Sequence, residues 1–140
     1  MMIKEALFPN EVVLKTENFI VSQDCEVPIP GFFIISSIRN VKSIAEFNYN
    51  EINEFSNIMF KLRIGMKNVL KIKEIYIFQN EDSEYNFHIW LFPRHEWMEK
   101  FGNKIESVKP IMNYARESMN NLETKELIKS HVKKMRDYFY

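Results

Sequence analysis

The sequence predicts an α+β protein built on a mostly antiparallel sheet with a long central helix. Three observations support this class: short apolar runs that favour β-strands, one long stretch with helical periodicity, and two helical stretches near the C-terminus. The expected order is strands, helix, strands and then helices, and segregated elements of this kind are typical of α+β folds. The 140 residues suit a single domain with one core.

Two strands are expected in the first third of the chain. Residues 19–21 form a short apolar run, and residues 31–35 are apolar throughout and rich in β-favouring side chains. Pro28 and Pro30 favour a turn or an irregular edge between these runs. We therefore expect the two strands to pair as a hairpin.

A long helix is expected to begin after Asn48. The Asn48 side chain can accept a hydrogen bond from the first turn, and Glu51 can return one, as in a capping box. The apolar residues that follow recur at helical spacing and are interpreted as core: Ile52, Phe55, Met59, Leu62, Met66 and Val69. Further strands are expected at residues 75–78 and 87–92, and Pro93 ends the second of them.

The C-terminal third, at about residues 105–138, is expected to form a helical hairpin. Its first helix has one apolar stripe, made by Val108, Met112, Ala115 and Met119. Pro110 fits this helix only if the helix begins close to Ser107. Asn120 and Asn121 supply the turn. Acidic residues early in the second helix and basic residues late in it suit the helix dipole.

Composition narrows the functional classes. Lys plus Arg equals Asp plus Glu at 19 each, which argues against a general nucleic-acid binder but allows a small anionic ligand. Cys25 is the only cysteine, so an intramolecular disulfide and a cysteine zinc cage are excluded, and no other protein metal site is visible. Met1 to Pro9 contains no long apolar run. We therefore expect no signal peptide, no membrane span and a cytoplasmic location.

Residues 83–94 contain the pattern that is most informative about function. If residues 87–92 form a strand, Asn86, His88 and Trp90 lie on one face, and Phe87 and Ile89 lie on the other. The first face therefore holds an amide, an imidazole and an indole, each of which can form hydrogen bonds. His88 is interpretable as a catalytic residue or as a hydrogen-bonded structural histidine. No second histidine has a spacing that would make a metal pair with it.

This segment resembles the motif of the histidine-triad (HIT) family, in which three histidines alternate with apolar residues and Pro-Arg often follows. Counted back from Pro93 and Arg94, the three triad positions fall on Asn86, His88 and Trp90, so only the middle one is histidine. The resemblance spans about residues 16–95. The remainder is similar to a HIT-like subgroup with a C-terminal helical hairpin, some members of which are named as diadenosine tetraphosphate hydrolases.

The resemblance implies a nucleotide-binding hydrolase or nucleotidyl transferase that acts on a nucleoside phosphate or a dinucleoside polyphosphate. The His88 side chain would attack the α-phosphorus and form a nucleotidyl-histidine, which water or another acceptor resolves. The residues that the resemblance places against the ligand are Ser83, Asn86 and Trp90 at the phosphates, Asp24 and Asn80 near the ribose, and Arg94 beside them. A homodimer is implied, and magnesium would enter only with the phosphates.

Each of these residues also has a structural interpretation. Trp90 can fill space, Asn86 can bond the end of a strand, Asp24 can form a turn, and Arg94 can be a surface ion-pair partner. Trp90 also cannot transfer a proton usefully, so a good leaving group such as a polyphosphate would suit the site. The alternative function is therefore a non-catalytic nucleotide-binding or interaction protein on a HIT-like scaffold.

Overall fold

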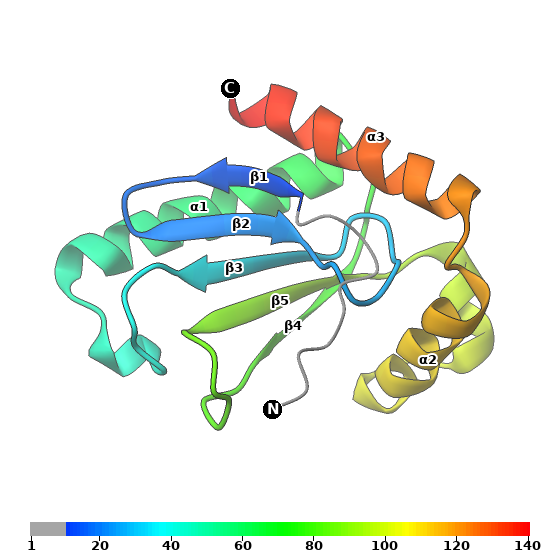
Figure 1. Cartoon of the computed structure of the whole chain (residues 1–140), viewed down its shortest axis with the longest axis horizontal. Helices are drawn as coiled ribbons and strands as arrows, with labels where there is room; N and C mark the ends of the chain where they lie inside the picture. Colours follow the sequence, from blue (N-terminus) through cyan, green and yellow to red (C-terminus); the bar gives the residue numbers. More distant parts are fainter. Residues whose placement is uncertain (1–10) are drawn as a thin grey trace.

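The structure is a computed structural model, which describes residues 11–140. Five strands form one antiparallel sheet in the order β1-β2-β3-β5-β4. The strands are β1 (Val12–Lys15), β2 (Phe19–Gln23), β3 (Phe33–Ser37), β4 (Ile75–Gln79) and β5 (His88–Pro93). Figure 1 shows the sheet with helices around it, which confirms the α+β class. The expectation for Met1 to Pro9 lies outside the described residues.

The predicted hairpin is confirmed as the β2–β3 pair, and its connection is held by one buried amide. Gln23 donates from Nε2 to the carbonyl of Ile29 at 2.8 Å, and its Oε1 accepts from the backbone N–H of Gly31 at 3.1 Å. Gly31 has a φ of 82°, which a residue without a Cβ adopts at little cost. Strand β1 was not predicted, because its four residues are a short edge with little apolar alternation.

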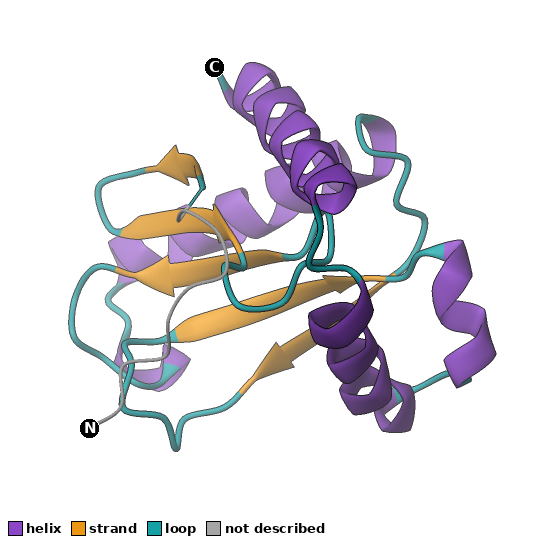
Figure 2. Cartoon of the chain, turned by 45° about the vertical axis from the view of Figure 1, so that its right-hand side comes forward, coloured by secondary structure: helices purple, strands orange, loops and turns teal. Residues whose placement is uncertain are grey.

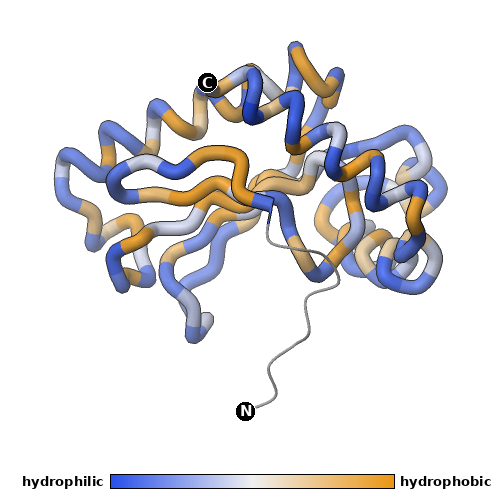
Figure 3. Tube along the Cα trace, turned by 45° about the horizontal axis from the view of Figure 1, so that its top comes forward, coloured by the Kyte–Doolittle hydropathy of each residue, from blue (hydrophilic) through white to orange (hydrophobic). Residues whose placement is uncertain are grey.

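One face of the sheet is covered by α1 (Tyr49–Asn68) and α3 (Leu122–Phe139). The capping box of Asn48 and Glu51 is present as predicted. The predicted core stripe of α1 is wrong at Ile52, which is 38% exposed, whereas Ile58 is buried. The buried face of α1 therefore includes Ile58 and excludes Ile52, which differs from the face that the spacing predicted. Figure 3 shows the apolar strands between the alternating colours of the helices.

The two C-terminal helices and the turn between them are present as predicted, but the helices pack on different faces of the sheet and not on each other. Helix α2 (Val108–Ser118) buries Val108, Ile111 and Ala115 in one cluster with the β5 residue Phe92. Helix α3 buries Ile128, Val132 and Met135 in the other cluster, together with α1. Each helix has an apolar stripe that suits a different face of the sheet, so the chain crosses between faces at Asn121, which caps α3. Figure 2 shows the two helices diverging from this turn.

The face that α2 covers only in part carries three rows of side chains. Tyr76 pairs with Phe92 beneath α2, and Ile34 and Phe78 flank Trp90 in the next row. The third row is polar, because Ser36 pairs with His88 at the start of β5. The alternation predicted for residues 86–92 is therefore correct, and it brings His88 to the uncovered end of this face. No helix within residues 11–140 is long and apolar enough to span a membrane.

Two short 3-10 helices connect β5 to α2 on this side of the molecule. They are η2 (Glu96–Phe101) and η3 (Ile105–Ser107). Met98 of η2 is fully buried in the α2 cluster, so the connection is packed down against the same end of the sheet as α2. Of the helices in residues 11–140 that lie on this face, none therefore covers its opposite end, around His88.

Candidate functional site

The orientation of the His88 ring is set by the backbone two residues earlier. Its Nδ1 lies 3.0 Å from the carbonyl oxygen of Asn86. A carbonyl oxygen only accepts hydrogen bonds, so Nδ1 carries the proton in the neutral ring and Nε2 carries the lone pair. Nε2 has no hydrogen-bond partner within residues 11–140. The ring therefore has the tautomer that an attacking imidazole requires.

The Asn86 side chain holds this carbonyl in place rather than facing a ligand as a donor. Its amide Nδ2 donates to the backbone oxygens of Ser37 and Ile38, at 3.3 and 3.2 Å. Both amide hydrogens are thus used by the end of β3. The remaining Oδ1 is an acceptor and cannot donate to a phosphate oxygen. The geometry therefore favours the structural interpretation of Asn86, as a positioning residue for His88, over direct phosphate binding.

His88 borders two hollows that meet at its ring. The larger, of about 560 Å³, lies on the β3 side, and the smaller, of about 240 Å³, lies on the β4 side. The larger one is lined by Asp24, Glu26, Ile34, Ser36, Ser37, Glu84, Tyr85, Asn86, His88 and Trp90. A volume of several hundred Å³ is typical of small-molecule sites. His88 therefore lies in open space of ligand size and not in a sealed core.

Ser36 is the hydroxyl nearest to His88 in the sheet register. The two residues are direct partners across the β3–β5 pair, and both side chains line the larger hollow. The hydroxyl of Ser36 makes no hydrogen bond within residues 11–140, so it can donate to a bound group. Sequence reasoning missed Ser36 because the pairing joins segments that are about 50 residues apart, and no local pattern indicates it.

Asp24 lines the larger hollow. Its Oδ2 accepts from the backbone N–H groups of Glu26 and Val27, at 3.2 and 2.7 Å, so it also forms the turn that the residues alone suggested. Burial raises the pKa of this carboxyl to about 6, although the two backbone donors oppose the shift. Oδ1 makes no hydrogen bond within the described residues and can accept from a ligand hydroxyl.

Trp90 forms a half-buried floor that extends beyond the two hollows. It packs edge-to-face on Phe32, with the ring centroids 5.4 Å apart. It lines both hollows at His88 and a third, of about 400 Å³, beneath α2. Its indole N–H makes no hydrogen bond within residues 11–140 and remains available as a donor. Trp90 thus both fills space and borders the ligand space.

The other residues implied by the resemblance differ in their placement. Asn80 lines the smaller hollow beside His88 and Trp90. Ser83 lies in the adjoining loop, where its hydroxyl oxygen accepts from the N–H of Tyr85 at 3.0 Å, and it does not line the hollows. The structure therefore brings together Asp24, Asn80, Asn86, His88 and Trp90, with Ser83 outside this group.

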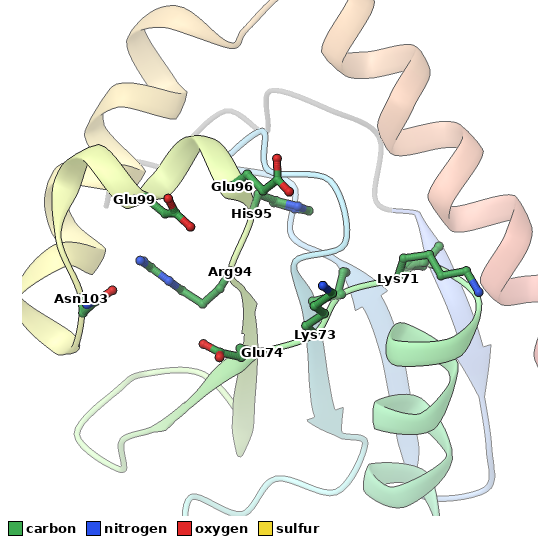
Figure 4. A pocket seen from close by; sticks show the side chains of 10 residues that line it. Lys71, Lys73, Glu74, Arg94, His95, Glu96, Glu99 and Asn103 are labelled. Atoms are coloured by element: carbon green, nitrogen blue, oxygen red, sulfur yellow. The ribbon is translucent and has the colours of Figure 1, made fainter.

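Arg94 does not reach His88. It follows β5 at the opposite end of the strand and lines a separate hollow of about 340 Å³. Figure 4 shows its side chain extending toward Glu99 and Asn103. The guanidinium donates to the hydroxyl of Ser107 at 3.2 Å and to the carbonyl of Gly102 at 2.8 Å, and it lies 5.2 Å from the ring centroid of Tyr76. Its contacts favour a structural role.

The remaining histidines and the cysteine are arranged as parts of the scaffold. His95 Nε2 lies 2.7 Å from the carbonyl of Pro30, and burial lowers the pKa of His95. His131 Nδ1 lies 2.9 Å from the carbonyl of Leu127, and burial lowers its pKa as well. Burial next to Asp24 raises the pKa of the Cys25 thiol. Within residues 11–140, no group of three or more His, Cys, Asp or Glu side chains could hold a metal ion.

Comparison of the sequence with protein-family models and with curated proteins finds no match. Comparison of the structure finds several histidine-triad proteins. A HIT-like protein involved in cell-cycle regulation from Bartonella henselae, solved with an unknown ligand, aligns at a TM-score of 0.63 and 16% identity, over 94% of this chain and 88% of its own. A hypothetical histidine triad nucleotide-binding protein from Sulfolobus tokodaii aligns at 0.64 and 14%, over 94% and 84%.

A member of the HIT family from Bacillus subtilis aligns at a TM-score of 0.56 and 14% identity, over 79% of this chain and 89% of its own. These likenesses span most of each protein, and they agree with one another. At this level of identity they establish the fold, so the chain has the HIT-like α+β architecture. The chemistry has to be argued from the residues around His88.

Proposed function

We propose that this protein is a nucleotide-binding hydrolase or nucleotidyl transferase that uses His88 as its nucleophile. The observation that carries the proposal is the 3.0 Å contact between Nδ1 of His88 and the carbonyl oxygen of Asn86. This contact fixes the proton on Nδ1 and leaves the lone pair of Nε2 unpaired beside a hollow of about 560 Å³. The likeness to a nucleotide-binding protein of the same fold supports the choice of ligand.

The reaction has two steps that balance in atoms and charge. In the first, Nε2 of His88 donates its lone pair to the α-phosphorus, a P–N bond forms, and the P–O bond to the leaving group breaks. The ring then carries a positive charge, which the Asn86 carbonyl stabilises through the Nδ1–H bond. In the second, water or another acceptor attacks phosphorus, the P–N bond breaks, and a proton passes to solvent while Nε2 regains its lone pair.

Donors in the hollow support these steps. The Ser36 hydroxyl lies opposite His88 in the sheet, and the Trp90 indole N–H borders the same space. Each is able to hold a phosphoryl oxygen as charge develops on it. Asp24 lies in the same hollow, where its free carboxylate oxygen suits a ribose hydroxyl. The ligand would therefore have its nucleoside on the β3 side of His88.

The substrate that suits this site best is a dinucleoside polyphosphate. Trp90 has no proton to transfer, so the leaving group has to depart without an acid. A polyphosphate is a stable anion and meets this requirement, particularly with magnesium on its oxygens. A nucleoside diphosphate or phosphoramidate would be a slower donor. Magnesium belongs to the substrate in this account and is bound by its phosphates.

The proposal is tested by turnover of adenosine and guanosine polyphosphates by the wild-type protein and by His88→Ala. We expect the substitution to abolish turnover while the dissociation constant for the nucleotide changes little. His131→Ala, which alters a histidine on α3, is the matched control and should retain turnover. Binding without turnover by the wild-type protein would support the non-catalytic alternative. No binding at all would leave only the fold.

We also propose a cytoplasmic homodimer, in line with the family resemblance. Strand β4 forms one edge of the described sheet, and Ile77 on it is 51% exposed. An exposed edge strand is able to pair with a second copy of the chain. Sedimentation of wild-type protein and Ile77→Lys would test this, because the charge should shift a dimer toward monomer and leave a monomer unchanged.

A further inference from the structure

We infer that the groove beneath α2 is the subsite for the leaving group and selects leaving groups that combine an aromatic ring with negative charge. This inference rests on the proposed function of His88. The groove, of about 400 Å³, is lined by Phe78, Trp90, Ile105, Val108, Lys109, Met112, Asn113 and Arg116. Neither the motif around His88 nor the fold assigns a role to these residues of α2.

The groove adjoins the space at His88. Trp90 borders both hollows at His88 and the α2 groove, and Phe78 borders the smaller hollow and the groove. These two residues pair across β4 and β5, so they form one uninterrupted apolar floor. A ligand that extends from His88 over Trp90 and Phe78 therefore reaches the groove.

The orientation of the His88 ring directs the leaving group to this side. Nδ1 faces Asn86, which precedes His88, and the two ring nitrogens lie on opposite sides of the ring. Nε2 is therefore turned away from Asn86. Trp90 follows His88 on the same face of β5. In an in-line displacement the leaving group departs opposite to the attacking nitrogen, and here that is the side away from Asn86.

The charged residues that line the larger hollow and the α2 groove favour the same side for the leaving group. Within residues 11–140, the larger hollow is lined by the acidic residues Asp24, Glu26 and Glu84 and by no Lys or Arg. A polyanionic leaving group would be repelled there. Among the residues that the structure describes, Lys109 and Arg116 line the α2 groove and no acidic residue does. The anionic part of the leaving group is therefore favoured over α2.

The apolar part of the groove suits an aromatic ring. Phe78 and Trp90 present ring surfaces on the sheet side, and Met112 presents a flexible thioether on the α2 side. Aromatic rings pack well on aromatic and methionine side chains. Met112 is half-buried at this position, so it can contact a bound ring without being part of the sealed core.

The test uses two donors that differ only in the leaving group: an adenosine diphosphate esterified on the β-phosphate with naphthyl, and the same compound with methyl. Both leaving groups are phosphate monoesters of equal charge, and any intrinsic difference in their departure is the same in every variant. The change in the ratio of their kcat/KM values between wild type and variant therefore reports the apolar contact. We expect the naphthyl donor to be favoured roughly 10-fold or more. Met112→Ala should lower this ratio toward one.

Met59→Ala, which truncates a half-buried methionine on α1, is the matched control and should leave the ratio unchanged. Lys109→Gln together with Arg116→Gln should slow both donors alike. The dissociation constants of the naphthyl and methyl donors are also measured with His88→Ala, and their ratio tests the subsite without turnover. Turnover or binding with a ratio near one, unaltered by Met112→Ala, would overturn the inference and leave the proposed function standing. If neither donor were turned over or bound, both this inference and the proposed function would be overturned.

Discussion

Ser36 and His88 are direct partners across the β3–β5 pair, and both residues line the larger hollow. Side chains that are directly opposite in an antiparallel pair lie close enough to act on one bound group. The pair therefore places a hydroxyl donor beside the proposed nucleophile. This relationship gives the site a phosphate donor that Asn86, with both amide hydrogens bound to backbone, does not supply.

Ser36→Ala should slow turnover more than it weakens binding. A hydroxyl that holds a phosphoryl oxygen contributes most when charge develops on that oxygen, so kcat should fall roughly 10- to 100-fold. KM should stay within a small factor of the wild-type value. Steady-state kinetics with a dinucleoside polyphosphate measures both.

Ser22→Ala is the matched control for Ser36→Ala. Ser22 lies on β2, opposite Ile34 on the same face, but it does not line the hollows at His88. Its loss should not alter kcat. Equal effects of the two substitutions would show that Ser36 acts through the sheet and not on the substrate.

Asp24→Asn should stabilise the fold at neutral pH and weaken nucleotide binding. Burial raises the pKa of Asp24 to about 6, above its ordinary value of 3.8, so ionisation costs the folded state more than the unfolded one. This cost is absent below about pH 4, grows as the pH rises toward 6, and is fully present above it. The asparagine amide does not ionise, so the free energy of unfolding should rise by about 1 to 3 kcal/mol at pH 7.5.

Thermal unfolding at pH 4 and pH 7.5 checks the stability part of this prediction, since the gain should appear only at the higher pH. Isothermal titration at pH 7.5 checks the binding part. Asp82→Asn, in the exposed loop after β4, should change neither quantity. A variant that is stabilised but binds nucleotide as tightly as the wild type would show that Asp24 serves the turn alone.

Arg94→Ala should cost stability and leave the kinetics unchanged. Its guanidinium holds Ser107 and the carbonyl of Gly102 in the segment that leads to α2, and it lies in a separate hollow. Loss of these bonds should lower the free energy of unfolding by about 1 kcal/mol. Chemical denaturation measures this loss. A large fall in kcat/KM without a change in stability would show instead that Arg94 contacts the substrate.

The local pattern predicted the elements well, and it predicted the shared face of Asn86, His88 and Trp90. Strand alternation depends only on neighbouring residues, so it is visible in one segment. The partner of His88 on β3 and the hollow under α2 depend on pairings between distant segments. The structural contacts of Asn86 and Arg94 could not be predicted for the same reason, because their bonds go to Ser37 and Ser107, which are far from them in sequence or in another element.

The packing of the two C-terminal helices on different faces of the sheet has a related explanation. Both C-terminal helices have an apolar stripe. Such a stripe shows that one side of a helix is buried, but it does not identify the element on which that side packs. Gly65 of α1 supplies part of the answer for α3. A Cβ at this position would lie 2.7 Å from Cε of Met135 and 2.7 Å from the ring of Tyr138. The glycine thus permits the close approach of α3 to α1.

Gly65→Ala should therefore destabilise the protein, although alanine in a helix interior ordinarily adds about 1 kcal/mol of stability over glycine. The Tyr138 ring cannot move freely, because its hydroxyl donates to the carbonyl of Lys61 at 2.9 Å. We expect a net loss of about 1 to 2 kcal/mol from overpacking. Thermal unfolding tests this when Gly65→Ala is made in the wild-type protein and, separately, in the Tyr138→Ala variant. The loss should shrink or reverse in the second background.

The proposed chemistry is tested most directly by trapping the covalent intermediate. The wild-type protein is mixed with a dinucleoside polyphosphate, quenched in base within one turnover, digested and examined by mass spectrometry. The account predicts a nucleotidyl group on the peptide that contains His88, stable in base, lost in acid, and absent from His88→Ala. Turnover of the same substrate with no adduct on that peptide, or full activity of His88→Ala, would contradict it.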